Sequence, residues 1–419
     1  MSSRRGKGDD RGREAGDAAG IGVICGRRWV SRADSIDAVR EIAERFDGLR
    51  GLPGCSIIKE NSVRSVFCVQ MAGGREVIVK HYRSRGLRGA LKYLFVKTKG
   101  KAEWVASRRM ALKNLPVPTV LAYGERRRGI FFEDASLVVE AVPNSVKVAG
   151  CLPAAGDAAG RERRRAIFGR IAGLCAAMHG QRVFHADFHG GNLLAACGGG
   201  PDGLPELYVI DLHSAGFPVF LRGVHRVRSL GFLAHSLREA ADLGELKEMC
   251  TQYSAAAGLT DGQARKLWPA IEREMVRREL SHIRTRSRRC LKNSSNFAVS
   301  RFDPFRIHRV RSMSIDTIMA AIDEHRRHAA DGDAAVVCRT ADGVVTRSAG
   351  VRVQEWFGQG LLRGGLRSRA MKAWIEQNRL AVRGERVAVP LAAVEGRSRR
   401  DSCYLVSTDD ERPGERSCG

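Results

Sequence analysis

Three short runs rich in β-branched and other apolar residues lie between residues 55 and 82. They cover 55–58, 66–71 and 77–80, and a Gly73-Gly74 pair separates the second run from the third. Short runs of this composition are typical of strands, and a glycine pair between two such runs is typical of a tight hairpin turn. The pattern therefore predicts three antiparallel strands.

A different spacing begins at Lys101. The apolar residues from there to Leu112 recur every three or four positions, which predicts a helix. Pro116 ends that pattern, because proline cannot continue a helix interior, and apolar runs at 120–123 and 137–142 predict two further strands. This part of the chain is thus predicted to be a small antiparallel sheet with one helix.

The rest of the chain is predicted to be mainly helical. An amphipathic helix at 161–178 precedes Gly180, a favourable residue just past a helix end. Residues 192–196 and 206–211 are predicted to form a hairpin across a glycine-rich loop. From 227 to 328 the apolar spacing predicts weakly separated helices at 234–241, 244–257, 261–283 and 315–328.

The end of the chain matches the predicted sheet-and-helix unit. Written without gaps, Trp104 aligns with Trp374 and Glu125 with Glu395. We interpret residues 331–419 as a degenerate, partial repeat of that unit. The alternative is a chance match, because apolar residues at helical spacing align easily.

The net charge indicates the kind of binding partner, and the cysteines indicate the redox environment of the protein. The 71 Lys and Arg residues outnumber the 46 Asp and Glu residues, giving a net charge of +25, which indicates an anionic partner. The 11 cysteines include no C-x-x-C pair, which argues against a disulfide framework or a zinc site and for a reducing, cytoplasmic environment.

No segment is predicted to cross a membrane. Residues 1–20 are rich in Arg, Asp and Gly and lack the apolar region of a secretory signal, so we expect them to be disordered. The most apolar stretch, 166–178, is interrupted by Arg170 and is too short to span a bilayer. Any membrane contact is therefore expected to be peripheral.

Residues that carry phosphoryl-transfer chemistry are concentrated near the middle of the chain. Segment 185–194 reads His-Ala-Asp-Phe-His-Gly-Gly-Asn-Leu-Leu, and an Ile-Asp pair ending at Asp211 follows. In kinases an Asp accepts the proton of the attacking hydroxyl, an Asn five positions later binds one magnesium ion, and a further Asp binds the other. Asp187, Asn192 and Asp211 have these types and this spacing.

A second part of the same chemistry lies upstream. Lys80 ends the third predicted strand, and Glu103 lies in the helix that follows. A strand lysine and a helix glutamate form the pair with which kinases hold nucleotide phosphates. In the aligned copy Gln354 and Ala373 stand at these positions, so we predict that the copy is catalytically empty.

Together these motifs resemble the lipopolysaccharide core kinase family, of the Kdo kinase and WaaP type, which has a protein-kinase-like fold. The resemblance runs from about residue 57 to 211 and more weakly to about 328. It rests on Val77–Arg83, on Glu103-Trp104, on Val117-Pro118-Thr119, on His185–Leu194 and on Ile210–His213.

The resemblance implies an α+β, bilobal fold with a small antiparallel β lobe, one helix beside it and a mainly helical large lobe. A partial second unit like the small lobe would follow at the C-terminus. We expect a disordered basic N-terminus at 1–20, an N-terminal extension at 21–50, the small lobe at 51–142, the large lobe at 143–330 and the degenerate repeat at 331–419.

Carried over residue by residue, the resemblance implies that Lys80 contacts the phosphates of ATP and that Glu103 orients Lys80. Asp187 would be the catalytic base. Asn192 and Asp211 would bind Mg²⁺, with Mn²⁺ as the alternative ion. These five residues, together with His189, would form the catalytic and metal site.

Three further features refine this expectation. No G-x-G-x-x-G loop precedes Lys80, so segment 59–65 is expected to cover the phosphates with ordinary backbone amides. Glu140, near the edge and hinge of the small lobe, is a candidate nucleotide-binding residue. His189 stands where protein kinases often carry a lysine that stabilises the transferring phosphoryl group, which favours a sugar or other small-molecule hydroxyl as acceptor.

A basic segment at 284–311 holds nine Lys and Arg residues against one acid. Such a segment binds an anionic glycolipid or the anionic face of the inner membrane, or it is simply a solvated surface. Both interpretations stay open from the sequence.

The sequence therefore predicts an ATP- and Mg²⁺-dependent kinase of a sugar hydroxyl, in the inner core of lipopolysaccharide, at the cytoplasmic face of the inner membrane. One alternative is a kinase of proteins or of small molecules such as aminoglycosides or choline. A second is a non-catalytic basic scaffold for nucleic acid or membrane. We do not expect nucleic acid as the partner, because a binding module has no need of the magnesium-binding set.

Overall fold

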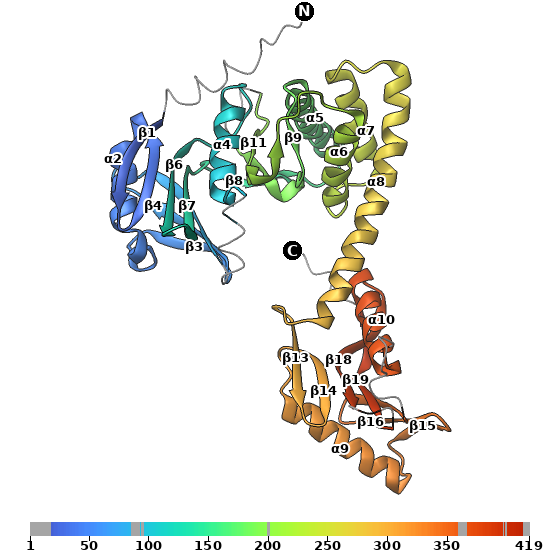
Figure 1. Ribbon diagram of the computed structural model, residues 1–419. Helices are drawn as coiled ribbons and strands as arrows, with labels where there is room; N and C mark the ends of the chain where they lie inside the picture. The colour runs from blue at the N-terminus through green and yellow to red at the C-terminus, as the bar shows by residue number, and fades with distance from the viewer. Residues whose placement is uncertain are drawn as a thin grey trace, which may run out of the picture. The chain divides into compact units, whose positions relative to one another are not determined.

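The computed structural model describes residues 18–84, 93, 96–198, 202–358, 367–396, 398 and 400–413. The chain forms two compact units, Met1–Val276 and Arg277–Gly419 (Figure 1). The boundary lies inside helix α8 (Asp261–Ser287), which contributes residues to both.

The first unit contains a seven-stranded antiparallel sheet in the order β1-β2-β6-β7-β5-β4-β3. We call residues 18–140 the sheet region. Its strands are β1 (Ala18–Ile24), β2 (Arg27–Arg32), β3 (Cys55–Glu60), β4 (Arg64–Gln70), β5 (Glu76–Arg83), β6 (Val120–Arg128) and β7 (Phe131–Glu140).

Two helices, α2 (Ile36–Glu44) and α4 (Lys99–Ala111), lie on opposite faces of this sheet (Figure 1). Val77 and Val79 of β5 belong to the apolar core that includes α2. Since successive strand residues point to opposite faces, Lys80 and Tyr82 face α4 instead. The side-chain alternation of β5 thus directs Lys80 toward the helix that carries Glu103.

The N-terminal part of the sheet corrects a prediction. Residues 1–17 lie outside the described residues, but Ala18–Gly20 belong to β1 and are not disordered, and 21–50 are not an extension outside the sheet. β2 pairs with β6, and Trp29 of β2 is fully buried. The sheet region therefore begins at residue 18, not 51, because burial of this strand requires a partner almost a hundred residues later.

The helical region of the first unit, residues 145–276, packs around one large apolar core. The predicted hairpin is confirmed, with Leu193 opposite Val209. The helix predicted at 234–241 begins earlier, at Gly223, where the His225 ring accepts the N–H of Arg222. The elements are β8 (Ser145–Lys147), α5 (Ala158–Gly180), β9 (Phe184–His185), β10 (Leu193–Ala196), β11 (Glu206–Val209), β12 (Ala215–Gly216), α6 (Gly223–Leu237), α7 (Leu243–Ala256) and α8, with 3₁₀ turns η3 (Val148–Cys151), η4 (Gly190–Asn192) and η5 (Leu212–Ser214).

The second unit contains another seven-stranded antiparallel sheet, in the order β13-β14-β18-β19-β17-β16-β15. Helices α9 (Ile315–Asp331) and α10 (Arg369–Arg383) lie on its two faces (Figure 1). Its strands are β13 (Phe297–Phe302), β14 (Phe305–Val310), β15 (Val336–Thr340), β16 (Gly343–Ser348), β17 (Val351–Trp356), β18 (Arg386–Gly396) and β19 (Cys403–Pro413).

Two predictions about this unit are wrong. Residues 227–328 are not continuously helical, because β13 and β14 lie within them, and the boundary falls at 276/277 instead of 330/331. Ile307 of β14 is fully buried against α9, and β14 pairs with β18. The interleaved arginines hide this strand from a local pattern, since its pairing partner lies almost ninety residues away.

Strand order and helix placement repeat between the two units. Each strand of the second sheet occupies the place of its counterpart, and α9 and α10 follow the same strands as α2 and α4. Lys80 of β5 lies opposite Leu137, and Gln354 of β17 opposite Leu405, on matching strands. The repeated unit is therefore a complete copy over residues 297–413, longer than the predicted 331–419.

Candidate functional site

The centre of the candidate site is a buried ion pair between β5 and α4. Lys80 Nζ lies 2.5 Å from Glu103 Oε1, and the Tyr82 hydroxyl donates to Glu103 Oε2 at 3.0 Å. Glu103 is only 3% exposed and Lys80 7%. A charge pair this buried keeps its geometry because each group depends on the other for compensation of its lost hydration.

The loop from 185 to 192 is held by its own polar groups. The His185 ring accepts the Asp187 N–H at 3.1 Å, and the Asn192 side-chain amide donates to the Asp187 carbonyl at 2.9 Å. The Asp187 carboxylate is 48% exposed. The Asp187 carboxylate is thus accessible, and the bonded Asn192 amide keeps its side-chain oxygen as a possible acceptor.

Asp211 joins this loop to the ion pair. It has φ 61° and ψ 44°, a left-handed conformation that a non-glycine residue rarely adopts. Its Oδ1 lies 3.4 Å from Lys80 Nζ, and both carboxylate oxygens accept from Arg64. Burial alone would raise the pKa of Asp211, but the Lys80 ammonium and the Arg64 guanidinium hold it well below its ordinary value.

His189 lies beside Asp187. Its Nδ1 accepts the Gly191 N–H at 3.1 Å, and its Nε2 is 3.9 Å from Asp187 Oδ2. Burial lowers the pKa of His189 below its ordinary value, and the Asp187 carboxylate opposes this shift. The ring is therefore mainly neutral at neutral pH, with its Nε2–H on the side of Asp187.

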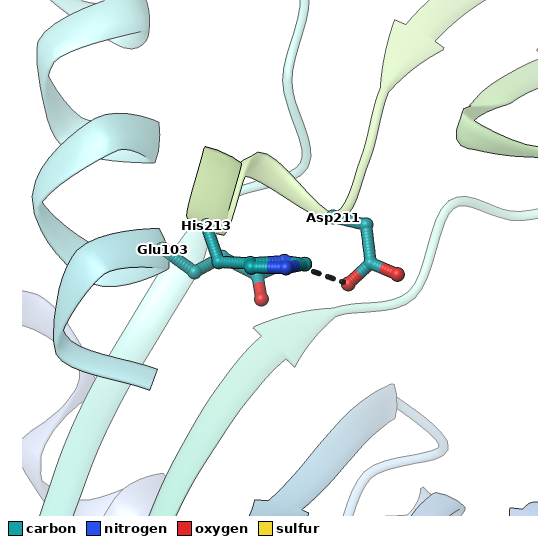
Figure 2. Close-up of side chains that lie close together, drawn as sticks. All are labelled: Glu103, Asp211 and His213. Carbon is teal, nitrogen blue, oxygen red and sulfur yellow. Dashed lines mark ion pairs between the residues drawn. The ribbon is translucent and has the colours of Figure 1, made fainter. Parts of the chain in front are cut away.

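Glu103, Asp211 and His213 bring possible metal-ligating atoms within 4.8 Å of one another (Figure 2). The Lys80 ammonium, however, already contacts the carboxylates of Glu103 and Asp211. A divalent cation placed among the same oxygens would be repelled at short range. Asn192 and Asp211 offer an amide oxygen and an ionised carboxylate, which Mg²⁺ prefers, and of the two it is Asp211 that contacts Lys80.

Two cations of the site were missed from the sequence. Arg64 begins β4, at the end of the segment expected to cover the phosphates, but nothing marked its side chain. Lys147 of β8 donates to the Gly191 carbonyl at 2.6 Å. Burial lowers the pKa of Lys147, Asp211 opposes this, and the nearby Lys80 acts with burial. No local sequence signal identifies Lys147, because β10 brings it to the site.

Glu140 takes a different position from the other candidates. It ends β7, and its carboxylate accepts from Arg75 at 2.9 Å. Among the described residues its side-chain contacts lead to Arg75 and not to Lys80 or Asp211. Its role in nucleotide binding stays a prediction.

The basic segment 284–311 runs from the end of α8 through β14, in the second unit. Part of it is structural: Arg311 donates to the Ser294 carbonyl at 2.9 Å, and Arg309 donates to the carbonyl of Met313. Arg284, Arg288 and Arg289 are exposed. The structure thus leaves part of this segment accessible to an anionic partner.

Within the described part of the chain, none of the helices combines the length and apolar character needed to cross a bilayer.

Comparison with known proteins gives a family match and distant structural matches. Residues 56–253 match the model of the lipopolysaccharide kinase (Kdo/WaaP) family. The solved structure of WaaP in complex with acyl carrier protein is 20% identical over 55% of this chain and 91% of that one, with a TM-score of 0.42.

A second solved structure is the Rio2 kinase–ADP/Mg²⁺–phosphoaspartate complex from Chaetomium thermophilum, 15% identical over 57% of this chain and 75% of that one, with a TM-score of 0.33. No curated protein matches the chain. The family match agrees with the resemblance drawn from the motifs.

Proposed function

We propose that this chain transfers the γ-phosphoryl group of ATP to a sugar hydroxyl of the lipopolysaccharide inner core, on Kdo or heptose. Residues 56–253 match the lipopolysaccharide kinase (Kdo/WaaP) family, whose members are phosphotransferases with an alcohol group as acceptor. The observation that carries the proposal is the contact network of Lys80, Glu103 and Asp211, beside the loop in which Asn192 holds the Asp187 backbone.

Asp187 is the catalytic base in this proposal. Its exposed carboxylate accepts the proton of the sugar hydroxyl as the oxygen attacks, and the bond from Asn192 to its carbonyl fixes the direction of approach. The neutral His189 ring beside it adds a donor without adding charge. A neutral donor at this position suits an uncharged sugar hydroxyl.

Lys80 orients the nucleotide through its phosphates, and Glu103 holds the ammonium in place from α4. Asn192 and Asp211 are the residues that would hold Mg²⁺, or Mn²⁺ in its place. When bound, this ion neutralises charge on the phosphates during transfer. Glu140, at the end of β7, is proposed to lie near the base of the nucleotide.

The acceptor also suggests a location. Inner-core glycolipid is anionic, and the chain carries a net charge of +25 with exposed arginines in segment 284–311. We propose that the protein works at the cytoplasmic face of the inner membrane and contacts it peripherally through charge.

The test is transfer of label from γ-labelled ATP to purified inner-core glycolipid. We expect wild-type transfer, and a loss of at least about a hundredfold in Asp187→Asn, since a positioned general base contributes about 10²- to 10⁴-fold. Asp202→Asn is the matched control: Asp202 is exposed and pairs with Arg170 in a surface loop. Equal transfer by Asp187→Asn and wild type contradicts the assignment, and label on protein instead of glycan favours a protein kinase.

A further inference from the structure

Arg64 is hydrogen-bonded to Asp211, the carboxylate that is proposed to bind the metal ion. Its Nη1 and Nη2 donate to Asp211 Oδ2 and Oδ1 at 3.1 and 3.0 Å. This is the two-pronged geometry in which a guanidinium binds a carboxylate most strongly. Both oxygens of Asp211 are therefore already bonded to the Arg64 guanidinium, in addition to the Lys80 contact.

The position of Arg64 is set by a tight turn between β3 and β4. The Asn61 side chain accepts the N–H groups of Val63 and Arg64 at 3.0 and 2.8 Å, and the Asn61 N–H donates to the Arg64 carbonyl at 2.8 Å. A side-chain oxygen that accepts nearby backbone donors stabilises such a turn without glycine. Hydrogen bonds thus stabilise the β3–β4 turn, which lies where other kinases have a glycine-rich loop, and the turn places Arg64 at the site.

The Arg64 side chain is partly exposed and lies against an aromatic ring. Arg64 is 23% exposed at its side chain, and its guanidinium carbon lies 5.4 Å from the centre of the Tyr82 ring. Tyr82 is in turn bonded to Glu103. A guanidinium against an aromatic face keeps a favourable contact while its hydrogen-bonding edge turns to another anion.

We propose that Arg64 is a positioning residue that neutralises Asp211 in the metal-free protein and turns to the phosphates of the nucleotide when the metal–nucleotide complex binds. The inference rests on the proposed function, because it requires that Asp211 bind the metal. The physical reason is that a divalent ion and a guanidinium repel each other when both bind one carboxylate. The oxygens of a nearby triphosphate can accept the same two hydrogen bonds from the guanidinium.

Two binding measurements test this without any turnover. In the first, Mn²⁺ is titrated into nucleotide-free protein and the free ion is followed by electron paramagnetic resonance. We expect Arg64→Ala to bind Mn²⁺ about tenfold more tightly than wild type, because its competitor for Asp211 is gone. In the second, ATP with Mg²⁺ is titrated calorimetrically, and Arg64→Ala is expected to bind it about tenfold more weakly, because two charge-assisted bonds are lost.

Arg64→Lys keeps a positive charge but not the fork, so it should weaken ATP binding by a smaller factor and fold even where the alanine variant does not. Arg45→Ala is the matched control, with the same change of charge at an exposed arginine paired with Glu41. Unchanged Mn²⁺ affinity or unchanged ATP affinity in both Arg64 variants overturns the inference. If the wild-type protein binds no ATP, the proposed function itself fails, which is a different outcome.

Discussion

The buried pair of Lys80 and Glu103 allows a quantitative prediction. In Glu103→Gln the side chain keeps its shape and loses its charge, so its oxygen still accepts from Lys80 while the pair loses its Coulombic attraction. Removing one partner of a buried pair costs about 3–5 kcal/mol when the other charge is left uncompensated. Here Asp211 remains 3.4 Å from the ammonium, which offsets part of that cost.

We therefore expect Glu103→Gln to lower the free energy of unfolding by about 2 kcal/mol, close to the difference between a charged and a neutral hydrogen bond. For a unit of this size the midpoint of thermal unfolding should fall by about 6 °C. The assay is urea unfolding followed by circular dichroism, with Glu41→Gln as control. Glu41 pairs with Arg45 at the surface, so that change should stay within about 0.5 kcal/mol.

A double-mutant cycle with Lys80→Met isolates the pair. The two single changes and the combined change should differ from additivity by about 1–2 kcal/mol, because contacting charges couple. Additive effects, or a Glu103→Gln variant as stable as wild type, would refute the reasoning that this pair is held together by burial.

Three further predictions concern pH, the internal repeat and the membrane. Burial lowers the pKa of His185 to about 4, so protonation favours the unfolded chain. The free energy of unfolding should therefore be fully retained above the ordinary histidine pKa of about 6.5. It should fall by up to about 3 kcal/mol as pH decreases from there to 4. Urea midpoints measured across this range should slope less in His185→Asn, and an equal slope contradicts the assignment. Thr98 and Ser368 cap α4 and α10 in the same way, because each side chain accepts the N–H of the third helical residue. Changing either residue to alanine should lower the free energy of unfolding by about 1 kcal/mol. A negligible decrease at either site would contradict the capping role there. Changing Arg288 and Arg289 to Glu should weaken sedimentation with anionic vesicles by about tenfold or more, while two exposed arginines of the first unit changed in the same way should have less effect; equal losses would assign binding to net charge alone.

The motif residues of the site could be identified from the sequence because they lie close together along the chain or at a familiar spacing. Asp187 and Asn192 are five positions apart and are bonded within their own loop. Lys80 and Glu103 lie on a strand and on the next helix, and the apolar residues of the sequence predicted both elements. The structure confirms that Lys80 and Glu103 are in contact.

Arg64 and Lys147 could not be found in this way. A surface arginine and a bonded one look alike in a sequence, and the partner of Arg64 lies 147 residues away. Lys147 reaches the site only because β8 pairs with β10. Their roles depend on which strands lie side by side, and that is a property of the folded chain.

By itself, the sequence determined the local elements, the kinase motifs and the resemblance to a family, because helix periodicity, turn residues and short motif spacings are set by neighbouring residues. Only the tertiary structure decided that β1, β2, β13 and β14 are strands and that the second unit is a complete copy of the first sheet. A strand is stabilised by a distant pairing partner and by burial of one face, as for Trp29 in β2 and Ile307 in β14. Those contributions do not exist until the chain has folded.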